Sequence, residues 1–213
     1  RWITHPVARN LIADVTVLPS FLRGPARDRD FMRFASERIR RHAPSAFAKA
    51  NYLREVLRDV GKHELAERSS SGRTVLVDEG AVLTAYHLFV YSRAPFDRTD
   101  LERFARLVPM PDRIVYVTAP LEVLVDRAMR RPDRRRELAS GRRDEVEASI
   151  SRAVAVFDGL VATPQIGART LTVDNADGSP AERDDVIARI AAFIDDGVSR
   201  TDERPASPRT PGS

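Results

Sequence analysis

Apolar residues along this chain alternate between a helical and a strand-like spacing. Phe31, Phe34 and Ile39 recur three to five positions apart, as on one face of an amphipathic helix. Short continuous apolar runs instead predict buried strands. Together the patterns predict helices over residues 28–42, 46–68, 81–91, 99–108, 143–161 and 180–195, a helix starting at Pro120, and strands over residues 74–78, 113–118 and 169–174.

Short strands separated by longer helices are typical of an α/β protein with a parallel sheet flanked by helices. Residues 99–102 and 179–182 read as capping boxes, and Pro120 suits the first position of a helix. From position 198 the chain is rich in Ser, Arg and Pro, which predicts a disordered tail over residues 198–213. We therefore expect one folded domain over residues 1–197.

Composition narrows the class of protein. The chain has 213 residues, of which 42% are hydrophobic, enough for one domain with a core. It has no apolar run of about 18 residues and no secretory leader, so we expect a cytoplasmic protein without a membrane span. It has no cysteine, and its four histidines lack the H-E-x-x-H spacing, which leaves disulfides, thiolate catalysis and a metalloprotease without support.

The charge balance keeps a nucleic-acid partner open as one hypothesis. There are 35 basic and 31 acidic residues, and only Lys49 and Lys62 are lysines. The pI is about 9.9. In the arginine-rich segment over residues 127–143 the basic residues are not interleaved with aromatic residues, however, which argues against a platform for stacking single strands. A nucleic-acid-binding protein would show binding that weakens steeply with salt.

The strongest chemical signal combines an acid with a cluster of arginines. Asp78 and Glu79 follow the apolar run 75–77, and the strand over residues 113–118 leads into a helix rich in arginine. An acid at the carboxyl end of a strand can hold Mg²⁺, and guanidinium groups can close over phosphates. The arginines are at positions 127, 130, 131, 134, 135, 136, 142 and 143.

Each part of this signal has a structural alternative. Asp78 could cap the helix that follows it, and Glu79 could be a solvated loop acid. On a continued helix Arg127, Arg131 and Arg134 would share one face. That face could bind phosphate, or it could pair with neighbouring acids as a solvated surface.

Residues 73–193 resemble P-loop small-molecule kinases, most closely the thymidylate kinase-like group. Residues 74–80 resemble the Walker B strand, and residues 113–122 with Arg127 resemble the strand and helix that lead to the lid. Residues 133–137 (D-R-R-R-E) are similar to the stretch after the lid. Residues 173–179 look like the loop that passes close to the adenine.

The resemblance implies a three-layer P-loop kinase sandwich and ATP-dependent phosphoryl transfer to a nucleotide or similar small molecule. Asp78 would hold Mg²⁺, Glu79 would act as a base, and Arg127, Arg131 and Arg134 would neutralise the moving phosphoryl group. Asn175 and Ala176 would lie near the adenine of ATP. The acceptor would lie by Tyr86, His87 and Arg93, although Tyr86 and His87 could be ordinary helix residues. A homodimer is left open.

The sequence also departs from the family. Glu79 stands where thymidylate kinases usually place an arginine, and the pair Tyr86 and His87 is one position out of step, so the acceptor need not be thymidylate. The phosphate-cradling loop G-x-x-x-x-G-K-[ST] does not occur in residues 1–213. In the family it opens the domain, so we expect it before Arg1.

The missing loop has consequences for stability and activity. Its strand would lie between the strands over residues 74–78 and 113–118, and without it their backbone groups would be unpaired. We therefore expect residues 1–213 to be poorly stable, or to bring the strands together in another order, and to be inactive. Two alternatives remain: a P-loop kinase for another small hydroxyl compound, which Glu79 favours, and a degenerate, non-catalytic binding or regulatory module.

Overall fold

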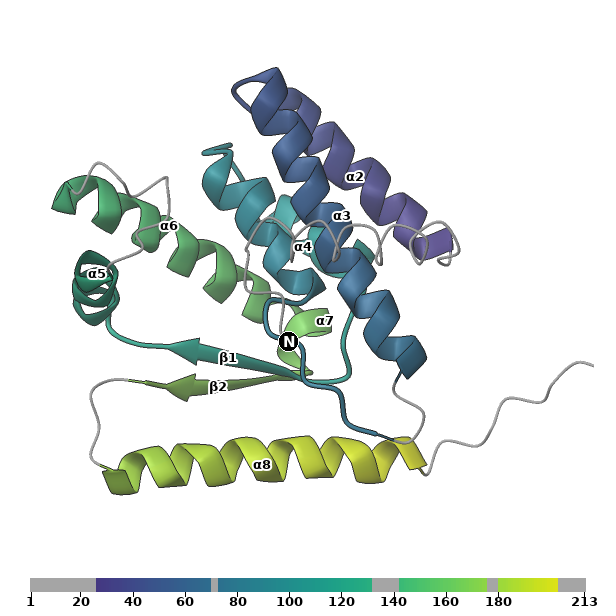
Figure 1. The fold of residues 1–213 in the computed structure, drawn as a ribbon, viewed down its shortest axis with the longest axis vertical. Helices are drawn as coiled ribbons and strands as arrows, with labels where there is room; N and C mark the ends of the chain where they lie inside the picture. The colour runs from purple at the N-terminus through teal and green to yellow at the C-terminus, as the bar shows by residue number, and fades with distance from the viewer. Residues whose placement is uncertain (1–25, 70–72, 132–141, 176–179, 203–213) are drawn as a thin grey trace, which may run out of the picture. The chain divides into compact units, whose positions relative to one another are not determined.

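The computed structural model describes residues 26–69, 73–131, 142–175 and 180–202. The elements in chain order are α2 (Ala26–His42), α3 (Ala46–Ser69), η1 (Ala81–Leu83), η2 (Tyr86–Tyr91), α4 (Arg98–Leu107), β1 (Ile114–Thr118), α5 (Leu121–Arg130), α6 (Arg143–Val161), α7 (Pro164–Gly167), β2 (Thr170–Asp174) and α8 (Pro180–Asp202) (Figure 1). The chain is mostly helical with a small parallel sheet, which agrees with the predicted α/β class at that level.

The chain divides into two compact units. Residues Arg1–Pro111 and Pro120–Ala168 form the first, which we call the helical unit. Residues Asp112–Ala119 and Arg169–Ser213 form the second, which we call the strand unit. The sequence had predicted one domain over residues 1–197.

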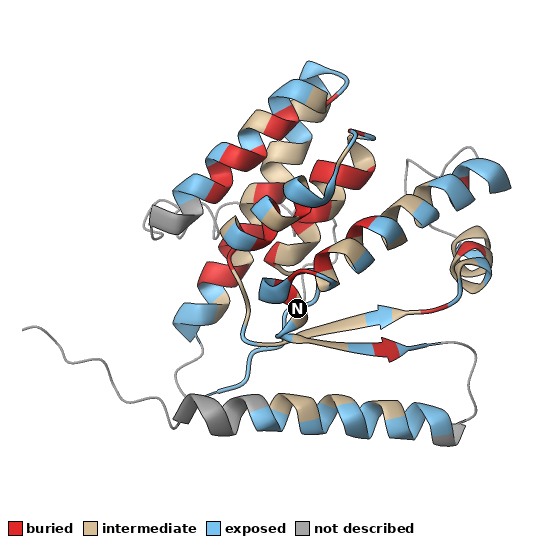
Figure 2. Cartoon of the chain, turned by 180° about the vertical axis from the view of Figure 1, so that it is seen from behind, coloured by how far each residue is buried: buried red, intermediate tan, exposed pale blue. Residues whose placement is uncertain are grey.

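Phenylalanines from three elements form the core of the helical unit. Phe31 of α2 and Phe89 of η2 each meet Phe104 of α4 edge to face, with ring centroids 5.7 and 5.8 Å apart. All three side chains are fully buried. Edge-to-face contact matches the positive ring edge with the negative ring face and adds to the hydrophobic gain. Figure 2 shows the buried residues gathered on the faces that these helices turn toward one another.

The first two predicted helices are confirmed as α2 and α3. The last turn of α2 carries Arg40, Arg41 and His42, whose positive charge suits the carboxyl end of a helix. The hydroxyl of Ser45 accepts a hydrogen bond of 3.1 Å from the N–H of Ala48, so Ser45 caps α3. Periodicity and capping therefore suffice for these two helices.

The predicted helix over residues 81–91 forms with unusual geometry. It begins as the 3₁₀ turn η1 and continues as the π-helix η2. The Thr84 hydroxyl donates a 2.6 Å hydrogen bond to the Ala81 carbonyl within this segment. Apolar periodicity cannot distinguish these windings, because all of them bury one face. A π-helix inside a helical segment is often found at a functional site.

Two predicted helix starts are wrong by one or two residues. Helix α4 starts at Arg98, and Asp97 rather than Thr99 is its cap. The Asp97 carboxylate accepts from the Asp100 N–H at 2.8 Å, and Asp100 Oδ2 accepts from the Asp97 N–H at 3.4 Å. Pro120 precedes α5 as its cap instead of forming its first residue. In each case several neighbouring residues are suitable to cap or begin the helix. The direction in which the preceding segment enters the helix selects one of them.

The strand unit contains β1, β2 and α8. The strands pair in parallel, with Ile114 opposite Thr170 and Thr118 opposite Asp174, so the predicted strands over residues 113–118 and 169–174 are confirmed. Helix α8 packs on β2 and runs antiparallel to the strands (Figure 1). Arg113 lies 4.8 Å from the Phe193 ring centroid and 3.4 Å from the Asp196 carboxylate, which ties α8 to the start of β1.

The predicted buried strand over residues 74–78 does not form. These residues have no regular structure, and Val75, Leu76 and Val77 are 42%, 78% and 41% exposed. In the described residues the sheet contains β1 and β2 alone. A strand is stable only when a neighbour takes up its N–H and C=O groups. Residues 74–77 have the composition of a strand, but no strand in the described part of the chain pairs with them.

Helix α8 is longer than predicted. It runs to Asp202, beyond both the expected end near 195 and the start of the predicted tail at 198. Residues 203–213 of that tail lie outside the described residues. Among the described helices none combines the length and apolar character needed to cross a membrane.

Candidate functional site

The turn at Asp78 and Glu79 carries the two acids predicted to act on Mg²⁺ and the acceptor. Both side chains are exposed. Glu79 has a φ of 57°, in the left-handed region that residues other than glycine seldom adopt. The Glu79 carbonyl accepts a 3.4 Å hydrogen bond from Lys62 Nζ of α3. The turn is thus connected to the preceding helix by a side chain rather than by a sheet.

Asp59 of α3 binds the same Lys62 side chain. It is only 2% exposed, and its Oδ1 accepts a 3.0 Å hydrogen bond from Lys62 Nζ. Its other carboxylate oxygen lies 3.9 Å from His87 Nε2. Burial raises the pKa of Asp59 to about 6, although Lys62 and Arg58 oppose the rise. Asp59 therefore joins the acid turn to the π-helix through Lys62 and His87.

The predicted acceptor residues Tyr86 and His87 belong to an aromatic cluster. Tyr91 is its centre, with ring centroids 4.6 Å from Tyr86, 5.4 Å from His87 and 6.2 Å from Tyr52. All four rings are half-buried. Tyr52 comes from α3, and the others come from η2. A half-buried group of rings beside a carboxylate has the chemistry to contact a planar heterocycle.

Arg93 follows the π-helix in a loop with unusual backbone geometry. It is exposed and has a φ of 50°. Arg152 of α6 donates from Nε to the Phe89 carbonyl at 2.7 Å and from its guanidinium to the Ala94 carbonyl. Arg38 donates to the Pro95 carbonyl at 3.1 Å. Two arginines distant in sequence therefore hold the loop that carries Arg93.

These arginines concentrate positive charge near Arg93. Burial lowers the pKa of Arg152, and the charges of Arg38 and Arg93 lower it further. The Arg38 guanidinium also pairs with Asp100 at 2.8 Å and lies 4.3 Å from the Phe89 ring centroid. The charge is thus partly neutralised, and the main role of Arg38 and Arg152 here is to anchor the loop.

The predicted lid arginines do not share one continuous helix. Arg127 is half-buried in the last turn of α5, which ends at Arg130. Arg131 has a ψ of 129°, outside the helical range. The next residue is Pro132, which disfavours helical geometry in the residue before it. The continued helix on which these arginines would share one face is therefore not present at Arg131. Arg134 lies outside the described residues.

Helix α5 is positioned by α6. The two helices pack together, and Arg143 of α6 binds the Asp126 carboxylate at 2.8 Å. Asp126 also lies 4.0 Å from Arg130. The helix that carries Arg127 thus packs on α6, whereas the turn that carries Asp78 is connected to α3 through Lys62. That both act on one triphosphate stays a prediction.

The predicted adenine loop begins at the end of the sheet. The Asn175 N–H donates a 2.7 Å hydrogen bond to the Thr118 carbonyl, and the Asn175 side chain is exposed. This bond extends the parallel ladder by one residue past β2. Ala176 lies outside the described residues.

Asp78 fits one part of a magnesium site. The described residues contain no group of three or more His, Asp or Glu side chains that could hold a metal by themselves. Mg²⁺ in phosphoryl-transfer enzymes is often held by one or two carboxylates together with substrate phosphates and water. An exposed Asp78 next to Glu79 has the chemistry for this, whereas the loop that would hold the phosphates does not occur in residues 1–213.

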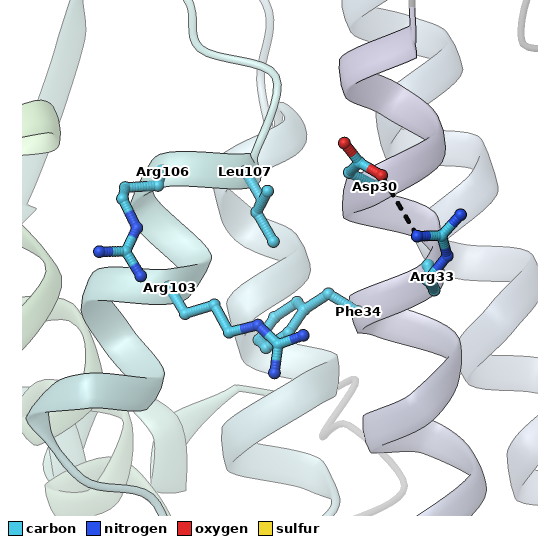
Figure 3. Close-up of a pocket in the computed structure, with 6 residues that line it drawn as sticks. All are labelled: Asp30, Arg33, Phe34, Arg103, Arg106 and Leu107. Carbon is cyan, nitrogen blue, oxygen red and sulfur yellow. Dashed lines mark ion pairs between the residues drawn. The ribbon is translucent and has the colours of Figure 1, made fainter.

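A shallow pocket of about 270 Å³ lies between α2 and α4 (Figure 3). Arg33 is 3.6 Å from Asp30, and the Arg103 guanidinium lies 5.0 Å from the Phe34 ring centroid. None of the residues predicted for the site lines this pocket. Its lining consists of Asp30, Arg33, Phe34, Arg103, Arg106 and Leu107.

Sequence reasoning missed the residues that support the site. Asp59, Arg38 and Arg152 lie within amphipathic helices, where their types read as ordinary surface positions. The available signal was their place on the apolar side of each helix, since a charge there must find a partner. No family model, curated protein or solved structure matches this chain.

Proposed function

We propose that this chain belongs to an ATP- and Mg²⁺-dependent phosphotransferase of the P-loop nucleotide kinase type. Its acceptor would be a nucleotide or a similar small molecule. The fold would be the three-layer sandwich of those kinases, with the phosphate-loop strand supplied from outside residues 1–213. The parallel pairing of β1 and β2, each followed by a helix, is compatible with that sandwich.

One observation carries the proposal. Asp59 of α3 connects the acid turn with the predicted acceptor region that follows it in the chain: Lys62 links Asp59 to the Glu79 carbonyl, and His87 Nε2 lies 3.9 Å from the second oxygen of Asp59. A kinase must bring the metal-binding acid close to the group that receives the phosphoryl. The aromatic cluster at Tyr86 and Tyr91 offers the rings on which a nucleobase could stack.

The roles of the individual residues follow from the chemistry of phosphoryl transfer. A bound Mg²⁺ would supply positive charge against the negative charge that develops during phosphoryl transfer. Asp78 would hold the ion, and Glu79 would orient the acceptor hydroxyl or accept its proton. Arg127, Arg131 and Arg134 would bind the transferred phosphate, and Asn175 and Ala176 would lie by the adenine. Glu79 in place of an arginine favours an acceptor other than thymidylate.

A screen of phosphate acceptors with Mg²⁺ and ATP tests the proposal. The protein should carry the sequence upstream of Arg1, because the proposal requires a G-x-x-x-x-G-K-[ST] loop there. We expect turnover with at least one nucleotide or small hydroxyl compound, and its loss in Asp78→Ala. Asp112→Ala, also an exposed acid, is the matched control and should retain turnover. An upstream sequence without that loop would contradict the proposal.

A non-catalytic binding module is the second candidate. It is favoured by the exposed, unpaired residues 74–77, since a kinase of this type needs them in its sheet. A module would bind a nucleotide or a protein without turnover, and Asp78→Ala would leave that binding unchanged. The same screen, with nucleotide binding measured in parallel, separates the two.

A further inference from the structure

The turn that carries Asp78 needs an external restraint. A residue other than glycine at a φ of 57° is disfavoured, because its side chain crowds its own backbone. Such a conformation persists only where surrounding contacts hold it. Residues 74–77 give little support on the N-terminal side, since they are exposed and unpaired.

Lys62 is placed to supply this restraint. Its ammonium group lies between Asp59 Oδ1 at 3.0 Å and the Glu79 carbonyl at 3.4 Å. Lys62 Nζ therefore connects a rigid helix to the backbone of the turn. Its side chain is 30% exposed, and that of Asp59 is 3% exposed, so the carboxylate is fixed by packing and the ammonium is fixed by the carboxylate.

We infer that Asp59 and Lys62 are positioning residues for Asp78: Asp59 fixes the Lys62 ammonium, which binds the Glu79 carbonyl and sets the turn. This inference rests on the proposed function for its catalytic consequence, because Asp78 is there the magnesium-binding acid. The geometric part stands without it. A simple helix pair between positions 59 and 62 would have no effect on residues 78 and 79.

The charge of Asp59 is essential to this arrangement. The groups around it are Glu55, Arg58 and Lys62 on α3 and His87 on η2. Protonation of Asp59 replaces a carboxylate by a neutral acid and weakens its hold on the ammonium. Because burial raises the pKa of Asp59 to about 6, this loosening falls in a range where the protein can be studied.

Cleavage by a glutamate-specific protease tests the geometry in residues 1–213 as they are. The bond after Glu79 is resistant while the turn is held and becomes accessible when it is released. At pH 7.5 we expect Lys62→Met to speed cleavage there about fivefold, as for loss of one hydrogen bond worth about 1 kcal/mol. Lys49→Met, which changes the other lysine of α3, should cleave like the wild type. Equal rates in Lys62→Met and the wild type would overturn the inference.

The pH profile separates positioning from mere structural support. Relative to a reference peptide cleaved in parallel, wild-type cleavage after Glu79 should rise about fivefold between pH 7.5 and 5. Asp59→Asn should remove this step, because it cannot titrate. A step that persists in Asp59→Asn would assign the effect to another group and overturn the role of Asp59. Circular dichroism checks that each variant is folded.

The catalytic consequence is measured separately. In the active, longer protein Lys62→Met should raise the Mg²⁺ concentration needed for half-maximal turnover about fivefold, with little change in KM for the acceptor. If no phosphoryl transfer is found at all, the proposed function fails while the protease result still decides the geometry. If transfer is found and Lys62→Met leaves the Mg²⁺ requirement unchanged, the positioning role fails while the function stands.

Discussion

Residues 74–77 and strand β1 have nearly the same composition, but only β1 forms a strand. The first segment is T-V-L-V and the second is I-V-Y-V-T, and both read as buried strands. Strand β1 pairs with β2 along its whole length, whereas residues 74–77 pair with nothing among the described strands and are exposed. A strand therefore depends on a neighbour that completes its hydrogen bonds, and propensity alone does not create one.

The two segments are also held in different ways. Strand β1 is held by backbone hydrogen bonds, which do not titrate. The turn after residues 74–77 is held by side chains, through Lys62 and the buried Asp59. Mutations and changes of pH can test this difference.

The largest effect on stability should come from a charge placed in the sheet of β1 and β2, compared with the same charge placed in residues 74–77. Val173 of β2 pairs with Val117 of β1 and is 1% exposed. Val173→Asp should cost about 3–5 kcal/mol in the free energy of unfolding, because an unpaired charge is buried. Leu76→Asp, at a residue 78% exposed, should change it by less than about 0.5 kcal/mol. Urea unfolding at pH 7 measures both free energies. Similar costs in the two variants would contradict the difference between the paired strand and residues 74–77.

The pH dependence of stability should be the next largest effect. Asp59 has its pKa raised from 3.8 to about 6 in the folded protein, so the folded state binds the proton more tightly. Its contribution to the free energy of unfolding is greatest below pH 3.8, falls as pH rises to about 6 and is then constant. The fall is about 3 kcal/mol.

Urea unfolding of the wild type and Asp59→Asn between pH 3.5 and 7.5 checks this. Other carboxylates titrate in both proteins, so their contributions cancel in the difference. Relative to the variant, the wild type should lose stability as pH rises. A difference independent of pH would contradict the prediction. At low pH the contribution of Asp59 to stability should thus rise while the turn at Glu79 loosens, because protonation removes a buried charge but weakens the hold on Lys62.

The smallest effect concerns the helix that leads into β1. Asp97 caps α4 through its bond to the Asp100 N–H, so Asp97→Ala should lower the free energy of unfolding by about 1 kcal/mol. Thr99, the cap that the sequence pattern suggests, lies inside the first turn. Thr99→Ala should therefore change stability by less than about 0.5 kcal/mol. Thermal unfolding distinguishes the two variants. A larger cost for Thr99→Ala would show that Thr99 is the cap, as the sequence pattern suggests.

Much of the secondary structure was predictable because it depends on local spacing. Helices α2, α3 and α6 and strands β1 and β2 lie where apolar periodicity places them. The exact cap of α4 and the π-helical winding of η2 were not. A cap is chosen among several suitable residues, and winding is chosen by packing. The end of α5 was available from Pro132, whose effect on Arg131 is local.

The residues of the candidate site likewise fall into those that the sequence indicates and those that only the structure reveals. The sequence singled out Asp78 and Glu79 by their place after a strand-like run, and the family resemblance singled out Tyr86 and His87; the roles of all four remain proposals. It did not single out Asp59, Arg38 or Arg152, because the partners of a buried charge come from distant parts of the chain. The sequence marked Lys62 only as one of two lysines, and its contact with Glu79 depends on how α3 meets the turn.

By itself the sequence determined where the chain forms helices and which short segments have strand character, because these follow from the spacing of apolar side chains. Tertiary structure decided which strand-like segment became a strand and which buried charge found a partner. Hydrogen-bonded ladders and buried ion pairs both join residues far apart in sequence, so their stability depends on what the fold brings alongside.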